Sequence, residues 1–229
     1  MTAVAQTSFD EAYSQWRTAL GSVTCGAAEL SEWQKRRFHF AFHTGALLTA
    51  GTLEGGPPVV GPVVYGVHIP GVGLSYIGQT QKAERRLRDL PVGESHHLAN
   101  TIPPELWERV VVVCWPSLLD QLEDQERATI DNMGRVVCGL ALEHLLQVDT
   151  EPPLNLRRRT NNGLWKQRRL TASKSRGALQ SAAIPRLHAL VRDEWNKLSS
   201  VPAPCDGSAR VTTEFGRTVF PSVLRHDVE

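Results

Sequence analysis

The sequence predicts an α+β fold, in which helices flank a small antiparallel sheet of three strands and helical extensions lie at both ends. Two short apolar runs with period-two alternation surround the turn sequence Pro70-Gly71-Val72-Gly73, and this pattern predicts a β-hairpin. The third strand is predicted over Arg109–Trp115, which is apolar on both faces and therefore favours an interior place in the sheet.

The helices are predicted from apolar spacing and from residues that start or stop helices. An N-terminal helix is expected between Ser8, a candidate N-cap, and Gly21. Thr80 is expected to cap the helix that follows the hairpin. Further segments are predicted as helices over about Ala27–Phe42, Gln81–Leu90, Ser117–Asp131, Val136–Val148 and 185–198, with a short strand near Arg217–Val223.

The chain, at 229 residues, is long enough for one substantial core with appendages. A loop rich in glycine and proline, residues 51–62, leads into the hairpin and marks a boundary. We therefore predict a helical extension over residues 1–58, a core over 59–156 and a basic, partly helical extension over 157–229.

The composition argues against several classes of protein. The formal net charge of +1 indicates no particular partner. The four cysteines are widely spaced, so neither a zinc site nor a disulfide framework is expected. The sequence shows neither a signal-peptide pattern nor an apolar run of roughly 18–20 residues, so a soluble, cytoplasmic protein without a membrane partner is expected.

Tyr65 and Tyr76 lie on the two strands of the predicted hairpin. Side chains two residues apart in a strand point the same way, so Tyr65 is expected to share a face with Val67. By the same rule, Tyr76 is expected to share a face with Leu74. Two phenols on paired strands have a chemical role only if polar groups face them.

Two charged side chains are predicted on otherwise apolar helix faces. Arg86 lies on, or at the edge of, the apolar stripe of the Gln81–Leu90 helix, and its permanent charge requires a partner or an anion. Glu143 has leucines at i−3 and i+3, so its carboxylate would be costly to bury unless a cation or metal is present.

The window from Pro152 to Arg192 contains no Asp or Glu but ten Lys or Arg residues. In a nearly neutral chain this local excess suits a polyanion. A solvated basic surface would give the same pattern, and the two interpretations stay open.

Taken in order, these residues resemble the GIY-YIG nuclease family. The first half-motif appears as Val64-Tyr65-Gly66-Val67, with Val where the family usually has Ile and with Val63 in place of Gly. The second half-motif is intact as Tyr76-Ile77-Gly78, eleven residues after Tyr65. Arg86 stands where the family places its catalytic arginine, and Glu143 and Asn155 match its metal-binding glutamate and its Pro-Asn ending. The resemblance covers about Pro62–Asn155.

The resemblance implies a GIY-YIG-like core and an endonuclease that uses Mg²⁺ (or Mn²⁺) to hydrolyse phosphodiester bonds of double-stranded DNA. Its catalytic residues would be Tyr65, Tyr76, Arg86, Glu143 and Asn155, with Glu143 also the metal ligand. A carboxylate can hold a hard divalent cation, and an arginine can donate two parallel hydrogen bonds to phosphate. One tyrosine would act as general base, for which Tyr65 is favoured. Asn155 would position the loop of the glutamate or a phosphate, or serve only as a turn residue.

The resemblance also implies which residues contact DNA and that the protein could form a dimer. The basic residues 156–176 are expected to contact phosphates, with Trp165 either stacking against the duplex or packing on the core. A homodimer would suit a palindromic site, with the N-terminal helices as the candidate interface. The candidate DNA-binding residues are Arg157, Arg158, Arg159, Lys166, Arg168 and Arg169.

One departure leaves alternatives open. The family usually has His or Tyr four residues beyond its arginine, where this chain has Leu90, and His96 or His97 could replace it or lie at the surface. The alternative function is therefore a nucleic-acid-binding or regulatory module with a degenerate nuclease site. Among nucleases, a restriction or phage-defence role is favoured by elimination, because the appended motifs of homing enzymes and the second domain of excision-repair subunits are not recognised. A DNA repair or homing-type nuclease is the remaining alternative.

Overall fold

The computed structural model describes residues 14–15, 18, 21, 26–51, 56–93, 98–159, 162, 164–204 and 208–226. Within these residues, an antiparallel sheet of five strands has the order β2-β1-β3-β7-β6. Its strands are β1 (Val63–Ile69), β2 (Gly73–Thr80), β3 (Arg109–Val113), β6 (Arg210–Thr212) and β7 (Gly216–Val219). A separate hairpin consists of β4 (Arg157–Arg159) and β5 (Trp165–Gln167). The predicted α+β class is confirmed.

The sheet is larger than the sequence predicted. The expected strands pair as β2-β1-β3, but β7 pairs with the free side of β3 and β6 pairs with β7. The prediction of three strands is therefore wrong in number, because a short strand near the end of the chain does not reveal its partner. The interior place predicted for β3 is confirmed, and residues 210–219 of the C-terminal segment belong to this sheet.

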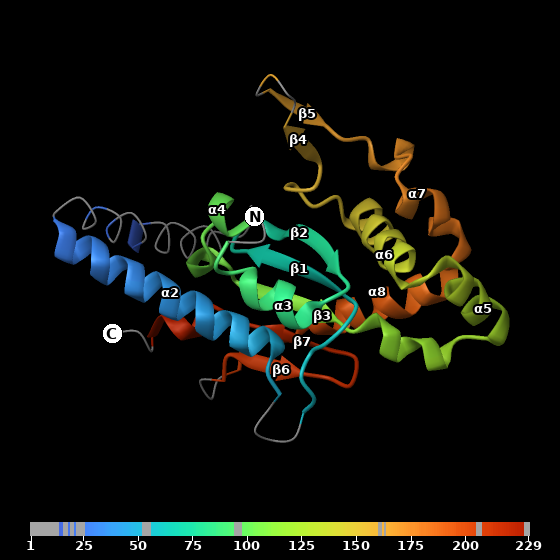
Figure 1. Ribbon diagram of the computed structural model, residues 1–229, viewed down its shortest axis with the longest axis horizontal. Coiled ribbons are helices and arrows are strands. Elements are labelled where there is room, and N and C mark those ends of the chain that lie inside the picture. The colour runs from blue at the N-terminus through green and yellow to red at the C-terminus, as the bar shows by residue number, and fades with distance from the viewer. Residues whose placement is uncertain are drawn as a thin grey trace.

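Helices cover both faces of the sheet (Figure 1). One face carries α2 (Ala27–Thr49), α3 (Ala83–Asp89) and α4 (Leu98–Thr101). The other carries α5 (Asp124–Met133), α6 (Arg135–Thr150) and α8 (Pro185–Ser200), with α7 (Arg176–Gln180) packed on α6. Short 3₁₀ helices are η1 (Pro104–Leu106), η2 (Trp115–Gln121), η3 (Leu170–Ala172), η4 (Ser181–Ala183) and η5 (Val223–His226). No helix in the described ranges is long and apolar enough to cross a membrane.

The helices lie where they were predicted but differ in length. The helix predicted over Ala27–Phe42 continues to Thr49, and the acidic segment divides into η2 and α5 because its backbone is extended at Leu122 and Glu123. Thr80 does not cap α3, whose N-cap is Lys82. Most of the helix predicted before Gly21, together with His96 and His97, lies outside the described residues.

Tyr65 and Tyr76 lie on the same face of the sheet because β2 contains a β-bulge. Val67 pairs with Tyr76 and His68 pairs with Leu74, which leaves Ser75 as an extra residue. The bulge breaks the period of two, so Leu74 packs in the core beneath α6 and α8 while Tyr76 packs beside Tyr65. The prediction that Tyr76 and Leu74 share a face is therefore wrong.

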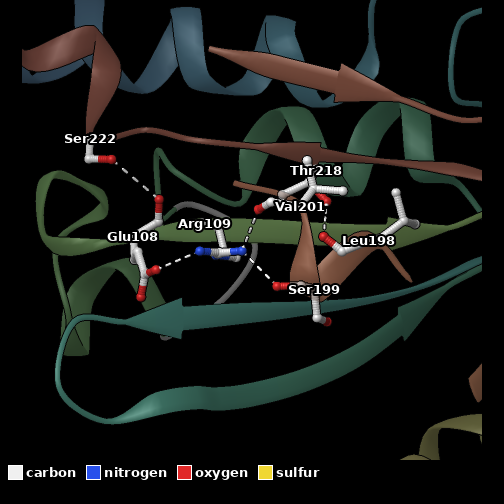
Figure 2. A network of polar contacts seen from close by, with 7 residues as sticks. All are labelled: Glu108, Arg109, Leu198, Ser199, Val201, Thr218 and Ser222. Carbon is white, nitrogen blue, oxygen red and sulfur yellow. Dashed lines mark hydrogen bonds and ion pairs between the residues drawn. The ribbon is translucent and has the colours of Figure 1, made fainter. Parts of the chain in front are cut away.

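Arg109 fastens the end of α8 to the sheet (Figure 2). Its Nη1 donates to the carbonyls of Ser199 and Val201 at 2.6 and 2.8 Å. Thr218 adds a bond from Oγ1 to the carbonyl of Leu198 at 2.7 Å. The last carbonyls of a helix lack partners within the helix, and a cation near them is favourable. These contacts fix the C-terminal end of α8 on the sheet.

Candidate active site

Four of the candidate residues, from β1, β2, α3 and α6, lie near one edge of the sheet, where β2 is the outermost strand. The rings of Tyr65 and Tyr76 lie with centroids 6.2 Å apart and planes tilted by 44°. Arg86 of α3 and Glu143 of α6 both act electrostatically on the two phenols. Arg86 is half-buried beside the buried stripe of α3, as its spacing predicted.

Gly78 makes room for the two rings. It pairs across the strands with Tyr65, and a Cβ atom there would lie 2.7 Å from the Tyr65 hydroxyl and 3.0 Å from Cε1 of Tyr76. Any side chain would therefore push the phenols apart. The glycine of the Tyr76-Ile77-Gly78 sequence thus has a direct steric role in the site.

Burial raises the pKa of both tyrosines. For Tyr65, which is fully buried, the nearby Arg86 guanidinium is the main opposing influence and lowers its pKa. The Tyr65 hydroxyl nevertheless makes no hydrogen bond of standard geometry to any described group. Arg86 and Tyr76 therefore lie close enough to act on the buried Tyr65 hydroxyl, although neither contact meets standard hydrogen-bond geometry.

The Glu143 carboxyl is the acidic centre of the site. Burial raises its pKa to about 7, and Arg168 and then Arg86 oppose this effect. A carboxylate that burial partly desolvates is stabilised in its ionised form by positive charge nearby, which the two arginines supply here and a metal ion could add to. The cost of burial that the sequence predicted for Glu143 is thus present in the structure.

Gln147 is a member of the site that the sequence analysis missed. Its Nε2 donates to Oε1 of Glu143 at 3.2 Å and to the backbone carbonyl of Ile77 at 3.4 Å. It therefore ties the carboxylate of α6 to the edge of β2. The signal that could have revealed it is its place four residues after Glu143, on the same face of a helix.

Asn155 holds the edge of β2 rather than pointing toward a substrate. Its Oδ1 accepts from the Ile77 backbone N–H at 2.8 Å, and its Nδ2 donates to the Ile77 carbonyl at 2.9 Å. The Asn155 side chain is buried, and both ends of its amide are engaged. Both bonds suit the predicted role of Asn155 in positioning this loop, and its predicted contact with a phosphate stays a prediction.

Arg168 connects the basic segment to the site. Its backbone N–H donates to the carbonyl of Leu156 at 2.6 Å, and its Nη1 donates to the carbonyl of Asn155 at 3.3 Å. The side chains of Arg157, Lys166 and Arg169 are exposed. Those of Arg158, Arg159 and Trp165, which lie on β4 and β5, are outside the described part of the structure.

Leu90, the position where His or Tyr was expected, is fully buried. It belongs to the core that includes Leu87, Leu98 and Trp107. The side chain at this position therefore stabilises the packing beside α3 and supplies no polar group to the site.

The comparisons with known proteins give no family: no family model, curated protein or solved structure matches this chain. No group of three or more His, Cys, Asp or Glu side chains that could hold a metal ion occurs among the described residues. The chemistry of the site is therefore inferred from its own residues. Two phenols, arginines and one half-buried carboxylate can bind an anion beside a cation.

Glu143→Gln should make the protein more stable than the wild type at alkaline pH in a metal-free buffer. The folded-state pKa of about 7 lies above the ordinary value of 4.5, so the folded protein binds more protons between these pH values. The free energy of unfolding contributed by Glu143 therefore falls as pH rises from 4.5 to about 7. The amide carries no charge and can still accept from Gln147. We expect an advantage on the order of 3 kcal/mol above this range and none below it.

Urea unfolding with EDTA at about pH 4.5 and about pH 8 measures this difference. The matched control is Asp131→Asn, which removes an exposed carboxylate from α5 and should change the stability by less than about 0.5 kcal/mol. A Glu143→Gln variant whose advantage is the same at both pH values would contradict the burial of this carboxyl.

Proposed function

We propose that this protein is a metal-dependent DNA endonuclease of the GIY-YIG type that hydrolyses phosphodiester bonds. The observation that carries the proposal is the convergence of Tyr65, Tyr76, Arg86 and Glu143 at one edge of the sheet, from β1, β2, α3 and α6. Phosphodiester hydrolysis needs a proton acceptor, a cation for the phosphoryl oxygens and a ligand for a divalent ion. These four side chains are of the required kinds.

The donors in the site suit Mg²⁺ or Mn²⁺. Magnesium is usually held by one or two carboxylates together with waters and substrate phosphates. Glu143 supplies one such carboxylate. Burial raises its pKa to about 7, and a cation at its oxygens would lower that pKa by stabilising the ionised form. A bound Mg²⁺ would supply positive charge that neutralises phosphoryl oxygens and makes neighbouring hydroxyl groups more acidic.

The roles of the side chains follow from their charge and position. Arg86 can donate two parallel hydrogen bonds to phosphate oxygens and stabilise the charge that gathers on them during hydrolysis. The Tyr65 phenolate would accept the proton of the attacking water as the water oxygen bonds to phosphorus. The bridging P–O bond would break at the same time, and the leaving oxygen would take a proton from solvent water. Burial raises the pKa of Tyr65 above its ordinary value, and the Arg86 guanidinium opposes this effect by favouring the phenolate, which is the form that can accept a proton. A bound Mg²⁺ would lower the pKa of the hydroxyl further. Tyr76 orients the water or the phosphate.

The closest competing function is a nucleic-acid-binding module without cleavage. Leu90 motivates it, because the family's usual polar residue is missing there and the position is part of the apolar core. The presence of Tyr65, Arg86 and Glu143 in one site favours the nuclease. Within the nuclease proposal, a restriction or phage-defence role requires a defined target sequence.

Purified protein should cleave double-stranded DNA with Mg²⁺ or Mn²⁺ and not with EDTA. Glu143→Ala should lower the rate at least ~100-fold, while DNA affinity is largely retained, because the lost interaction acts on the reaction more than on binding. Sequencing the ends of the products maps the cleaved bond and tests for a defined target. The control is Asp131→Asn. Cleavage at the wild-type rate by Glu143→Ala would refute the proposed metal site.

Tyr65→Phe should lower the cleavage rate by roughly 10²- to 10⁴-fold, which is the usual contribution of a positioned general base. Tyr76→Phe should lower the cleavage rate by a smaller factor than Tyr65→Phe. The Tyr65 hydroxyl lies close to Arg86 and Tyr76, so its removal can change the stability as well as the rate. Single-turnover cleavage together with thermal unfolding separates the two effects. Near-normal rates in both variants would remove the tyrosines from the mechanism.

Gln147→Met should raise the Mg²⁺ concentration needed for half-maximal cleavage by about 10-fold or more, because residues that orient a metal ligand typically have effects of this size. The variant keeps the length of the side chain and loses the bond to Oε1 of Glu143. A second readout is the Mg²⁺ concentration that half-maximally raises the melting temperature. Gln125→Met, on the exposed face of α5, is the control. An unchanged Mg²⁺ requirement would show that Gln147 has only a packing role.

A further inference from the structure

A pocket with a basic lining follows the β4–β5 hairpin. Its volume is about 460 Å³, and it is formed by the end of β5, η3 and the turn that precedes α7. Among the described residues, neither Asp nor Glu lines it. The polar side chains that line it are Lys166, Gln167, Arg168, Arg169, Ser173, Lys174 and Ser175. This concentration of positive charge makes the pocket suitable for an anion.

The pocket is mounted on the helix that carries Glu143. Leu170, at the start of η3, is buried. Gly177 of α7 lies so close to α6 that a Cβ atom there would be 2.3 Å from the carbonyl oxygen of Leu140. Figure 1 shows α7 and the β4–β5 hairpin on the same side of the molecule as α6. The position of the pocket relative to Glu143 is therefore set by the packing of α7 on α6.

Arg168 belongs both to the pocket and to the surroundings of Glu143. It lines the pocket, and it is also the charge that most strongly opposes the raised pKa of Glu143. Its guanidinium is anchored on the carbonyl of Asn155, next to the edge of β2. Arg168 therefore contributes positive charge both to the pocket and to the candidate active site.

We propose that this pocket is a second phosphate-binding site, which holds a backbone phosphate of the DNA close to the phosphodiester bond that is cleaved. The proposal rests on the proposed nuclease function for its ligand. DNA presents phosphates at regular steps along each strand, and most protein contacts to them fix the register of the protein on the duplex. The pocket thus sets which phosphate reaches Glu143.

The test uses the full chain carrying Glu143→Gln, so that binding is measured without cleavage. Lys166→Ala with Lys174→Ala is added, and fluorescence anisotropy gives the affinity for a short labelled duplex at several salt concentrations. The slope of log K against log salt should become shallower by about 1 to 2, because each lost phosphate contact accounts for about 0.9. The affinity should fall several-fold at low salt.

The matched control removes two lysines elsewhere, Lys35 of α2 and Lys197 of α8, whose side chains are 74% and 72% exposed. Lys35→Ala with Lys197→Ala should leave the salt slope unchanged. Both pocket lysines lie on segments with exposed side chains, so the variant should fold, and thermal unfolding checks this. A pocket variant with the same slope as the control would overturn the proposal.

A neutral methylphosphonate, introduced one position at a time along the duplex, identifies the phosphate in the pocket. A substitution near the cleaved bond should weaken binding by the protein with an intact pocket and have no added effect on the pocket variant, since both changes remove the same contact. Equal added losses in both proteins would overturn the proposal. If the pocket variant has a shallower salt slope but the wild-type protein does not cleave DNA, the nuclease proposal is refuted and the pocket proposal stands. If the wild-type protein cleaves DNA but the pocket variant keeps the salt slope of the control, the pocket proposal is refuted and the nuclease proposal stands.

Discussion

The outer edge of β2 is the constraint on which the candidate site depends. An edge strand leaves peptide groups unpaired, and here the N–H and C=O of Ile77 are both satisfied by the side-chain amide of Asn155. Gln147 reaches the same carbonyl and also holds Glu143. The chain that leaves α6 is thereby fastened to the strand that carries Tyr76. Hydrogen bonds that close a sheet edge thus also bring the carboxylate toward the phenols.

The site is maintained at a cost to stability. Burial raises the pKa of Tyr65 and of Glu143, so the ionised form of each side chain is disfavoured in the folded protein. Functional sites commonly contain such unfavourable groups, while the packed core offsets them. The two apolar cores on either side of the sheet fulfil this role here. A ligand that brings positive charge to Glu143 would recover part of the cost.

The sequence predicted those parts of the site that are visible in local patterns. Arg86 and Glu143 were recognisable because a charge on an apolar helix face is unusual wherever the helix packs. The bulge at Ser75 was not, since it depends on how β2 pairs with β1 and not on its own residues. The same holds for β7, whose pairing with β3 extends the sheet to five strands, and for the bonds of Gln147 to Ile77. All three features depend on contacts between separate segments of the chain, and local patterns of residues do not reveal such contacts.

The helix α6 contacts both the candidate active site and the segment that carries the proposed phosphate pocket. One part of α6 presents Glu143 to the edge of β2, and another, at the carbonyl of Leu140, receives Gly177 of α7 at a distance that excludes any side chain. The basic pocket before α7 is therefore positioned against α6 by this close contact. If DNA binds there, a displacement of α6 alters the grip on the backbone and the position of the carboxylate together. Coupling of this kind follows from close packing, because a rigid contact leaves no independent adjustment for either side.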